Sequence, residues 1–355
     1  MNLVALEPAA DTVTAGEALD AAVNKPILPG RMQFYTATTQ NRILKMLRSA
    51  MGPAVTALLD DPVVTELSAN SDGRVWVDRV GEGRRDTGES LSPAAVHRIL
   101  SIVADAKGEA IGDTHPSFDA IVPGHGYRFI GTLPPLTPAP TMTIRKKPSR
   151  VISLSEYEKA RILSPRHREF LEDASRERLN LIIAGGTGSG KTTLANAILA
   201  VMAETGHRII TIEDTPELQN SAADQESLYA LPGIRTMQDC LRCALRMHPD
   251  RLIFGEVRGP EVRDMLMAWN TGHRGGLCTI HADSAKDTLA RIEEMLATGS
   301  AGPPPRAQIA RAIHVIVFIE TTRDRTRYPA GRFVADVIRV EGLDAENRYR
   351  LTAVS

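Results

Sequence analysis

The residues with the clearest chemical pattern form a glycine-rich segment in the middle of the chain. Residues 185–193 read GGTGSGKTT and satisfy the spacing G-x-x-x-x-G-K-[ST]. Glycines in such a loop let backbone N–H groups wrap phosphate oxygens, where side chains would block the approach. The pattern predicts an ATP-binding phosphate loop made of Gly185, Gly186, Thr187, Gly188, Ser189, Gly190, Lys191, Thr192 and Thr193.

Two side chains at the end of this loop have separate predicted roles. We expect an exposed Lys191 that contacts the β- and γ-phosphates, and a Thr192 hydroxyl that ligates Mg²⁺. The apolar run at 179–184 predicts a buried strand before the loop, and apolar residues at helical spacing follow it. Strand, loop and helix therefore occur in the order that this kind of site requires.

Carboxylates close two further apolar runs. RLIFGE ends at Glu256, and RIITIEDTPEL carries Glu213 and Asp214, with Glu217 beyond them. An acid at the carboxyl end of a strand can lie beside Mg²⁺ at the sheet edge, so Glu256 is the predicted Walker B acid. Either acid alone could be a solvated surface group, but two of them beside a phosphate loop favour a catalytic site.

His281 ends another short apolar run, GLCTIH. A single histidine is more often structural than catalytic, and that alternative stays open. Its position at a strand end beside a glycine-rich turn favours reach into the phosphate crevice.

The pattern of elements predicts two domains of different class. Helical and short strand patterns mix up to residue 146, which predicts a smaller α+β domain at 36–146. Beyond residue 178, short apolar runs alternate with helical stretches, which is typical of a mostly parallel sheet with covering helices. We assign 1–35 to a mobile acidic tail, 147–165 to a basic linker and 166–355 to an α/β nucleotide-binding domain.

The composition narrows the classes of protein to which this chain could belong. The chain has 355 residues, with 42 basic against 43 acidic side chains and a net charge of -1. No global field therefore draws it to nucleic acid or anionic lipid. Three cysteines are too few for a disulfide framework, and no signal peptide or long apolar run is visible, so we expect a cytoplasmic protein.

Taken together, the motifs resemble a known family. GGTGSGKTT, TIEDTPEL, RMHPDRLIFGEVRG and AWNTGHRGGLCTIHADSA are similar to the Walker A, Asp, Walker B and His boxes of the type II/IV secretion ATPases. AWNTGH, LANAIL and KPSRVISLSEY look most like its TrbB-type conjugal transfer members. The resemblance spans about residues 40–339 and implies a RecA-like second domain after a PAS-like first domain.

The resemblance also implies an assembly and a function. Members work as hexameric rings on the cytoplasmic face of a type IV secretion system, next to its inner-membrane subunits. We therefore expect an ATP-hydrolysing homo-oligomer that powers pilus assembly, substrate transfer or both. Its expected location is peripheral at the inner membrane, reached through those partners.

Residue roles follow from the same motifs. The resemblance implies that Glu213 polarises the attacking water, that Glu256 holds Mg²⁺ partly through water, and that His281 faces the γ-phosphate. Related ATPases sense the γ-phosphate with first-domain arginines, and the candidates here are Arg128 in HGYRF and Arg145 in TMTIRKK. The alternative for both arginines is an ordinary solvated surface charge.

Two other functions compete with this interpretation. A RecA-like recombinase or helicase would act on DNA, but aromatic residues make up only 4% of the chain and no basic-aromatic stacking surface is visible. We expect no direct sequence-specific contact with nucleic acid. A scaffold that binds ATP without turnover is disfavoured by the presence of Glu213, Glu256 and His281.

Overall fold

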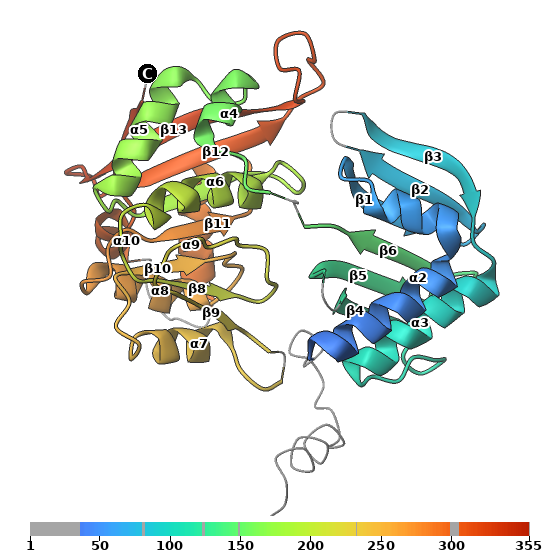
Figure 1. The fold of residues 1–355 in the computed structure, drawn as a ribbon. Coiled ribbons are helices and arrows are strands. Elements are labelled where there is room, and N and C mark those ends of the chain that lie inside the picture. The colour runs from blue at the N-terminus through green and yellow to red at the C-terminus, as the bar shows by residue number, and fades with distance from the viewer. Residues whose placement is uncertain are drawn as a thin grey trace, which may run out of the picture.

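Two β-sheets organise the chain, one in each half of the molecule shown in Figure 1. The computed structural model describes residues 36–79, 82–122, 125–147, 150–231, 233–298 and 305–354. The acidic tail predicted at 1–35 lies outside these residues. Among the helices described, none is both long and apolar enough to cross a membrane.

The first sheet has six antiparallel strands in the order β3-β2-β1-β6-β5-β4. Two helices, α2 (Ala37–Asp60) and α3 (Pro93–Lys107), pack on one of its faces. The strands are β1 (Val64–Ala69), β2 (Arg74–Arg79), β3 (Gly83–Ser90), β4 (Ser117–Val122), β5 (Tyr127–Thr132) and β6 (Thr141–Arg145). This helix-on-sheet arrangement confirms the predicted α+β class of the N-terminal half.

Local sequence signals explain the ends of α3. The Ser92 side chain accepts a hydrogen bond from the Ala95 N–H, and Pro93 opens the first turn. Gly108 ends the helix in the left-handed region at φ 79°, where a residue without Cβ is favoured. The apolar stripe between these caps faces the sheet and includes Val96, Ile99, Leu100 and Val103.

The second sheet has eight strands in the order β14-β13-β12-β7-β11-β10-β8-β9. The strands from β12 to β9 run parallel to one another, whereas β13 and β14 are antiparallel additions at one edge. They are β7 (Leu181–Ala184), β8 (Ile209–Glu213), β9 (Gln225–Tyr229), β10 (Arg251–Phe254), β11 (Leu277–Ile280), β12 (Val315–Thr321), β13 (Arg332–Leu343) and β14 (Tyr349–Ala353). The prediction of a mostly parallel sheet is confirmed.

Helices cover both faces of this sheet. Along β7, Leu181 and Ile183 join one core while Ile182 and Ala184 join the other, because successive side chains of a strand point to opposite faces. One face carries α4 (Leu154–Lys159), α5 (Pro165–Arg176) and α6 (Lys191–Ala203). The other carries α7 (Met237–Ala244), α8 (Glu261–Asn270), α9 (Asp287–Ala297) and α10 (Arg306–Ala312).

Part of the stretch assigned to the linker is packed against the second sheet. Leu154, Tyr157 and Leu163 are buried in the same core as residues of α6 and β7. A capping box at Ser153 and Glu156 starts α4. The domain boundaries remain predictions, and this packing favours a second domain that begins before α4 rather than at residue 166.

The order of the parallel strands positions the site. The carboxyl ends of β7, β11, β10 and β8 lie side by side at one edge, in that sequence. The phosphate loop follows β7, and His281, Glu256 and Glu213 lie at or just after the ends of the other three strands. Residues separated by up to about a hundred positions in sequence therefore meet at one place.

Candidate functional site

Two glycines of the phosphate loop are required by its geometry. Gly190 has φ 101° and is the N-cap of α6, so it turns the chain directly into the helix. A Cβ on Gly185 would collide with the Ile319 carbonyl oxygen and would lie 2.8 Å from Ser189 Oγ. The loop therefore closes tightly between β7 and α6, with the positive end of the helix dipole at its mouth.

Lys191 is buried and only 7% exposed, which corrects the expectation of an exposed side chain. Its Nζ donates to the carbonyl oxygens of Gly185 at 3.0 Å and Gly186 at 2.9 Å. Burial lowers the pKa of Lys191, and the positive charge of Arg145 adds to that effect. The loop's own carbonyls thus hold the ammonium where the predicted phosphates would bind.

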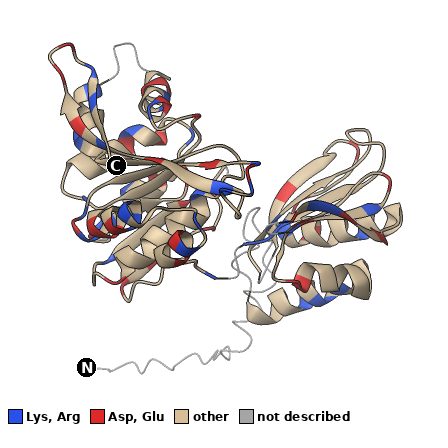
Figure 2. Cartoon of the chain, turned by 90° about the horizontal axis from the view of Figure 1, so that it is seen from above, with Lys and Arg blue, Asp and Glu red and all other residues tan. Residues whose placement is uncertain are grey.

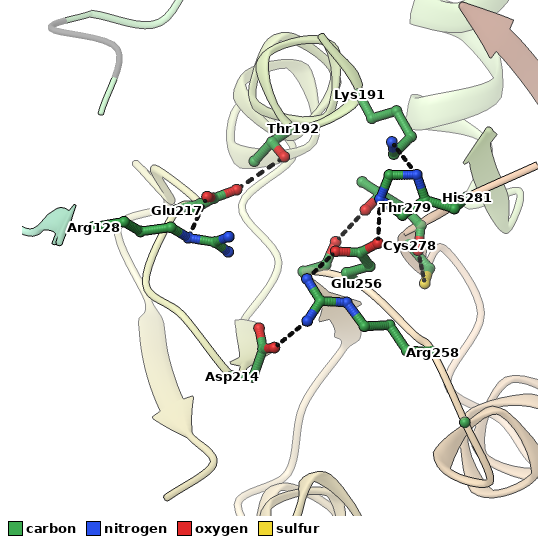
Figure 3. Close-up of polar contacts among 12 residues, drawn as sticks. Arg128, Lys191, Thr192, Asp214, Glu217, Glu256, Arg258, Cys278, Thr279 and His281 are labelled. Carbon is green, nitrogen blue, oxygen red and sulfur yellow. Dashed lines mark hydrogen bonds and ion pairs between the residues drawn. The ribbon is translucent and has the colours of Figure 1, made fainter. Parts of the chain in front are cut away.

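His281 lies between Lys191 and Glu256, the predicted Walker B acid. Its Nδ1 is 3.2 Å from Lys191 Nζ, and its Nε2 is 3.0 Å from Glu256 Oε1 (Figure 3). Burial lowers the pKa of His281, and the neighbouring Lys191 charge adds to this, so the ring is held neutral near pH 7. The structure therefore brings Lys191, His281 and Glu256 into one series of close contacts. The first contact is a hydrogen bond, whereas the second is a close approach, because Glu256 Oε1 has no hydrogen-bond partner among the described residues.

Arg258 is a site residue that the sequence analysis did not identify. It donates to Glu256 Oε2 at 2.6 Å and to Asp214 Oδ2 at 3.2 Å, so it joins the Walker B and Asp boxes. A pocket of about 320 Å³ adjoins these three side chains. The available signal was its position two residues after Glu256 in GEVRG.

Glu213 ends β8, the strand beside β10, and is almost completely buried, at 1% exposure. Its Oε1 accepts hydrogen bonds from the backbone N–H groups of Glu217 and Leu218, both at 2.8 Å. Within the described part of the chain, its Oε2 has no hydrogen-bond partner. Burial raises the pKa of Glu213 to about 7, opposed by the two N–H donors and by the charge of Lys147. A carboxylate with this pKa suits proton transfer near neutral pH, once water reaches its unpaired and buried Oε2.

The two predicted arginines lie opposite each other in the first sheet. The antiparallel register pairs Arg128 of β5 with Arg145 of β6, which puts both side chains on the same face. Arg128 Nε lies 2.9 Å from Glu217 Oε1 of the second domain. Arg145 is exposed, and its charge acts on Lys191. Both arginines therefore lie on the side of the first sheet that meets the site.

The Thr192 hydroxyl donates to Glu217 Oε2 at 3.0 Å. Glu217 was not among the predicted site residues. It lies four residues beyond the end of β8, and nothing in the TIEDTPEL segment indicated that its side chain would reach α6. This contact places the Glu217 carboxylate beside the hydroxyl that is predicted to bind Mg²⁺.

These oxygen groups fit Mg²⁺. No three His, Cys, Asp or Glu residues in the described ranges form a ready metal cage. Mg²⁺ does not need one, because it usually keeps several waters and binds one or two carboxylates together with substrate phosphates. The Thr192 hydroxyl and the nearby carboxylates supply hard oxygen donors of that kind.

Comparisons with known proteins agree with the motifs. The family described as "Type II/IV secretion system protein" matches residues 116–335. "Conjugal transfer protein TrbB" of Rhizobium radiobacter is 38% identical over 311 residues, covering 87% of this chain and 93% of the relative. "Type IV secretion system protein PtlH" of Bordetella pertussis is 32% identical, covering 79% of this chain and 92% of the relative.

A solved structure supports the fold independently. The pilus retraction motor PilT with bound ADP aligns with a TM-score of 0.60 at 18% identity, covering 87% of this chain and 82% of that chain. Identity this low concerns the fold alone, and it supports the arrangement of an antiparallel N-terminal sheet followed by the mostly parallel sheet.

Proposed function

Because this chain belongs to the type II/IV secretion system protein family and is a homologue of conjugal transfer and type IV secretion ATPases, we propose that it hydrolyses ATP to drive that machinery. The observation that carries the proposal is the continuous contact from Lys191 through His281 to Glu256 at the carboxyl edge of the sheet. A scaffold that only bound ATP would not need these three contacting side chains, or a base such as Glu213 whose pKa is raised.

The proposed roles follow the geometry. Lys191 leaves the loop carbonyls and binds the β- and γ-phosphates, because phosphate oxygens are stronger partners for an ammonium. Glu213 accepts the proton of the attacking water through its free Oε2. His281 faces the γ-phosphate from the end of β11. Bound Mg²⁺ would neutralise phosphate charge, held by Thr192 and, through water, by Glu256.

The proposed assembly is a homo-oligomeric ring, hexameric by resemblance, on the inner-membrane subunits of a type IV secretion system. Figure 2 shows basic and acidic positions interspersed along the elements of both halves of the described chain, and the full sequence is nearly neutral, with a net charge of -1. This distribution supports attachment through protein partners rather than through anionic lipid or nucleic acid. The ring would serve pilus assembly, substrate transfer or both.

Phosphate release by the purified protein tests the proposal. The full chain with ATP and Mg²⁺ should turn over, and turnover should rise with its own secretion complex more than with single-stranded DNA. Lys191→Ala should lower the rate by roughly 10²–10³-fold, the range for losing one preorganised donor to developing charge. A wild-type rate equal to that of Lys191→Ala, with the complex present, would overturn the proposal that this site hydrolyses ATP.

The pH dependence of turnover is expected to follow the ionisation of Glu213. Because its pKa is raised to about 7, the protonated carboxyl cannot accept a proton below that pH, and the rate should fall as pH decreases through about 7. Lys147→Met removes a positive charge that lowers this pKa, so the inflection should move to higher pH. Lys159→Met changes an exposed lysine of α4 and should leave it in place. An inflection that Lys147→Met does not move would assign the profile to another group.

A further inference from the structure

Thr279 binds the backbone on both sides of Glu256. It lies in β11 with 1% exposure, and its hydroxyl donates to the Gly255 carbonyl oxygen at 2.6 Å (Figure 3). Its own carbonyl oxygen accepts the Val257 N–H at 3.2 Å. The first of these groups belongs to the peptide unit before Glu256, and the second belongs to the peptide unit after it. Because the orientations of two successive peptide planes define φ and ψ of the residue between them, Thr279 fixes both soft dihedrals of Glu256.

The regular pairing of β10 with β11 ends before this turn, which we call the Walker B turn (residues 255–257). The last register pair joins Phe254 to Cys278, so Glu256 lies two residues beyond it. Past that pair, the turn is tied to β11 through the hydroxyl and the carbonyl of Thr279. The position of Glu256 therefore depends on a side-chain bond and not on the strand ladder alone.

On its other side, the Walker B turn is confined by β8. The Gly255 N–H donates to the Ile212 carbonyl oxygen at 2.9 Å, and a Cβ on Gly255 would lie 3.0 Å from Glu213 Cγ. This side of the turn is held by a backbone bond and by the absence of a side chain. On the β11 side, the Gly255 carbonyl is held by the Thr279 hydroxyl, which a substitution can remove.

Thr279 also bears on the distance between Glu256 and His281. Glu256 Oε1 lies 3.0 Å from His281 Nε2 but has no hydrogen-bond partner among the described residues. A close approach without a hydrogen bond depends on where the two backbones place the side chains. Thr279 precedes His281 by two residues and binds the turn that carries Glu256, so it connects the two backbones directly.

The ordinary explanation of a buried hydroxyl is that it merely satisfies its own hydrogen bond. Thr211 of β8 is a matched case. It is also 1% exposed and lies two residues before Glu213, and its hydroxyl donates to Ser227 Oγ of β9 at 2.9 Å. Because Ser227 lies within a strand and not in a turn of the site, Thr211 reports the cost of losing a buried hydroxyl by itself.

We propose that Thr279 is a positioning residue for the Walker B turn. Its hydroxyl fixes the peptide group before Glu256 and so holds the carboxylate beside His281, where it would contribute to binding Mg²⁺ through water. The inference deepens the proposed function and rests on it, because it concerns the same nucleotide site. It gives a buried, uncharged strand residue a part in metal binding that is exerted through Glu256.

The first measurement is the Mg²⁺ dependence of binding of AMP-PNP, a non-hydrolysable ATP analogue, by the full chain. Thr279→Val replaces the hydroxyl by a methyl group of similar size, so the Gly255 carbonyl loses this donor without a large cavity. The Mg²⁺ midpoint should rise by roughly 10–100-fold, the usual effect of losing a group that orients a metal ligand. Thr279→Ser keeps the donor and should stay near the wild-type midpoint. Thr211→Val should leave the midpoint unchanged.

Two controls separate positioning from folding. In EDTA, Thr279→Val should bind AMP-PNP as tightly as wild type, because the phosphate loop is unchanged. The melting temperatures of Thr279→Val and Thr211→Val should fall by similar amounts, since each variant loses one buried hydrogen bond. If Thr279→Val does not fold, Thr279→Cys is compared with Thr211→Cys; the weak S–H donor should give a smaller rise of the Mg²⁺ midpoint.

A double-mutant cycle tests whether Thr279 acts through Glu256. Glu256→Gln alone should raise the Mg²⁺ midpoint. Adding Thr279→Val should raise it no further, because the carboxylate that the hydroxyl positions is already absent. An equal rise in the wild-type and Glu256→Gln backgrounds would mean that Thr279 acts by another route, and the positioning role would be wrong.

The outcomes distinguish this inference from the proposed function. Normal Mg²⁺-dependent binding of AMP-PNP by the wild-type chain, with an unchanged midpoint in Thr279→Val, overturns the positioning role and leaves the ATPase proposal intact. Equal rises in Thr279→Val and Thr211→Val, or weaker binding of Thr279→Val in EDTA, would indicate a merely structural role and also overturn it. A wild-type chain that binds no nucleotide with or without Mg²⁺ overturns both proposals.

Discussion

Arg128→Ala is expected to lower ATP turnover by roughly 10³–10⁵-fold, the effect of an added arginine in phosphoryl transfer. Charge builds on the transferred phosphoryl group, and the phosphate loop neutralises it only in part. Arg128 comes from the first domain, pairs with Glu217 and points its terminal nitrogens into the site. Closure of the first domain on ATP would bring this guanidinium to the γ-phosphate, which couples occupancy to the angle between domains.

Affinities measured beside turnover test this role. Arg128→Ala should keep the ring and the affinity for ADP, which lacks the γ-phosphate, but lose the preference for ATP. Arg145→Ala should act in the same direction, because the register places it beside Arg128 and its charge reaches Lys191. Arg98→Ala, on the exposed side of α3, is the matched control and should behave as wild type. Full turnover and wild-type ATP preference in both Arg128→Ala and Arg145→Ala would show that these two arginines are ordinary surface charges.

Glu213→Gln is expected to lower turnover by roughly 10²–10⁴-fold, the usual effect of losing a general base. The amide oxygen of glutamine can still accept the N–H groups of Glu217 and Leu218, so the local backbone should stay in place. It cannot take a proton from water. ATP binding should therefore survive while the chemical step fails, and the rate that remains should no longer change with pH through about 7.

Two comparison variants make this result specific. Glu226→Gln alters an exposed carboxylate on β9, the strand beside β8, and should leave turnover unchanged. Glu256→Gln should lower turnover and also change the Mg²⁺ response. If Glu213→Gln hydrolyses ATP normally while Glu256→Gln does not, the roles of base and metal-holding acid are reversed.

Several features could be predicted because they depend on neighbours in the chain. The phosphate loop is a local pattern, because the spacing of its glycines determines the backbone conformation. The apolar residues at helical spacing that follow it predict α6. Carboxylates at strand ends were visible in the same way, since Glu213 ends β8 and Glu256 follows β10 closely. The alternation of short apolar runs with helices sufficed for the mostly parallel sheet.

Other features depended on how distant segments pair. The strand order puts β11 between β7 and β10, which is why His281 contacts both Lys191 and Glu256; periodicity within a segment carries no information on its neighbour in the sheet. Lys191 was expected to be exposed, yet the loop carbonyls and His281 enclose it. The packing of α4 on the second sheet likewise depends on a core shared by separate segments.

The sequence by itself determined the nucleotide loop, the acids that could serve it and the class of both halves of the chain, because each follows from local spacing and composition. Only the tertiary structure decided which acid accepts the hydrogen bond of the Thr192 hydroxyl and which arginine pairs with that acid. Glu217 lies four residues beyond the end of β8, and Arg128 lies in another sheet. Their meeting requires the turn after β8 and the placement of the first domain, and both arise from long-range packing that no local pattern encodes.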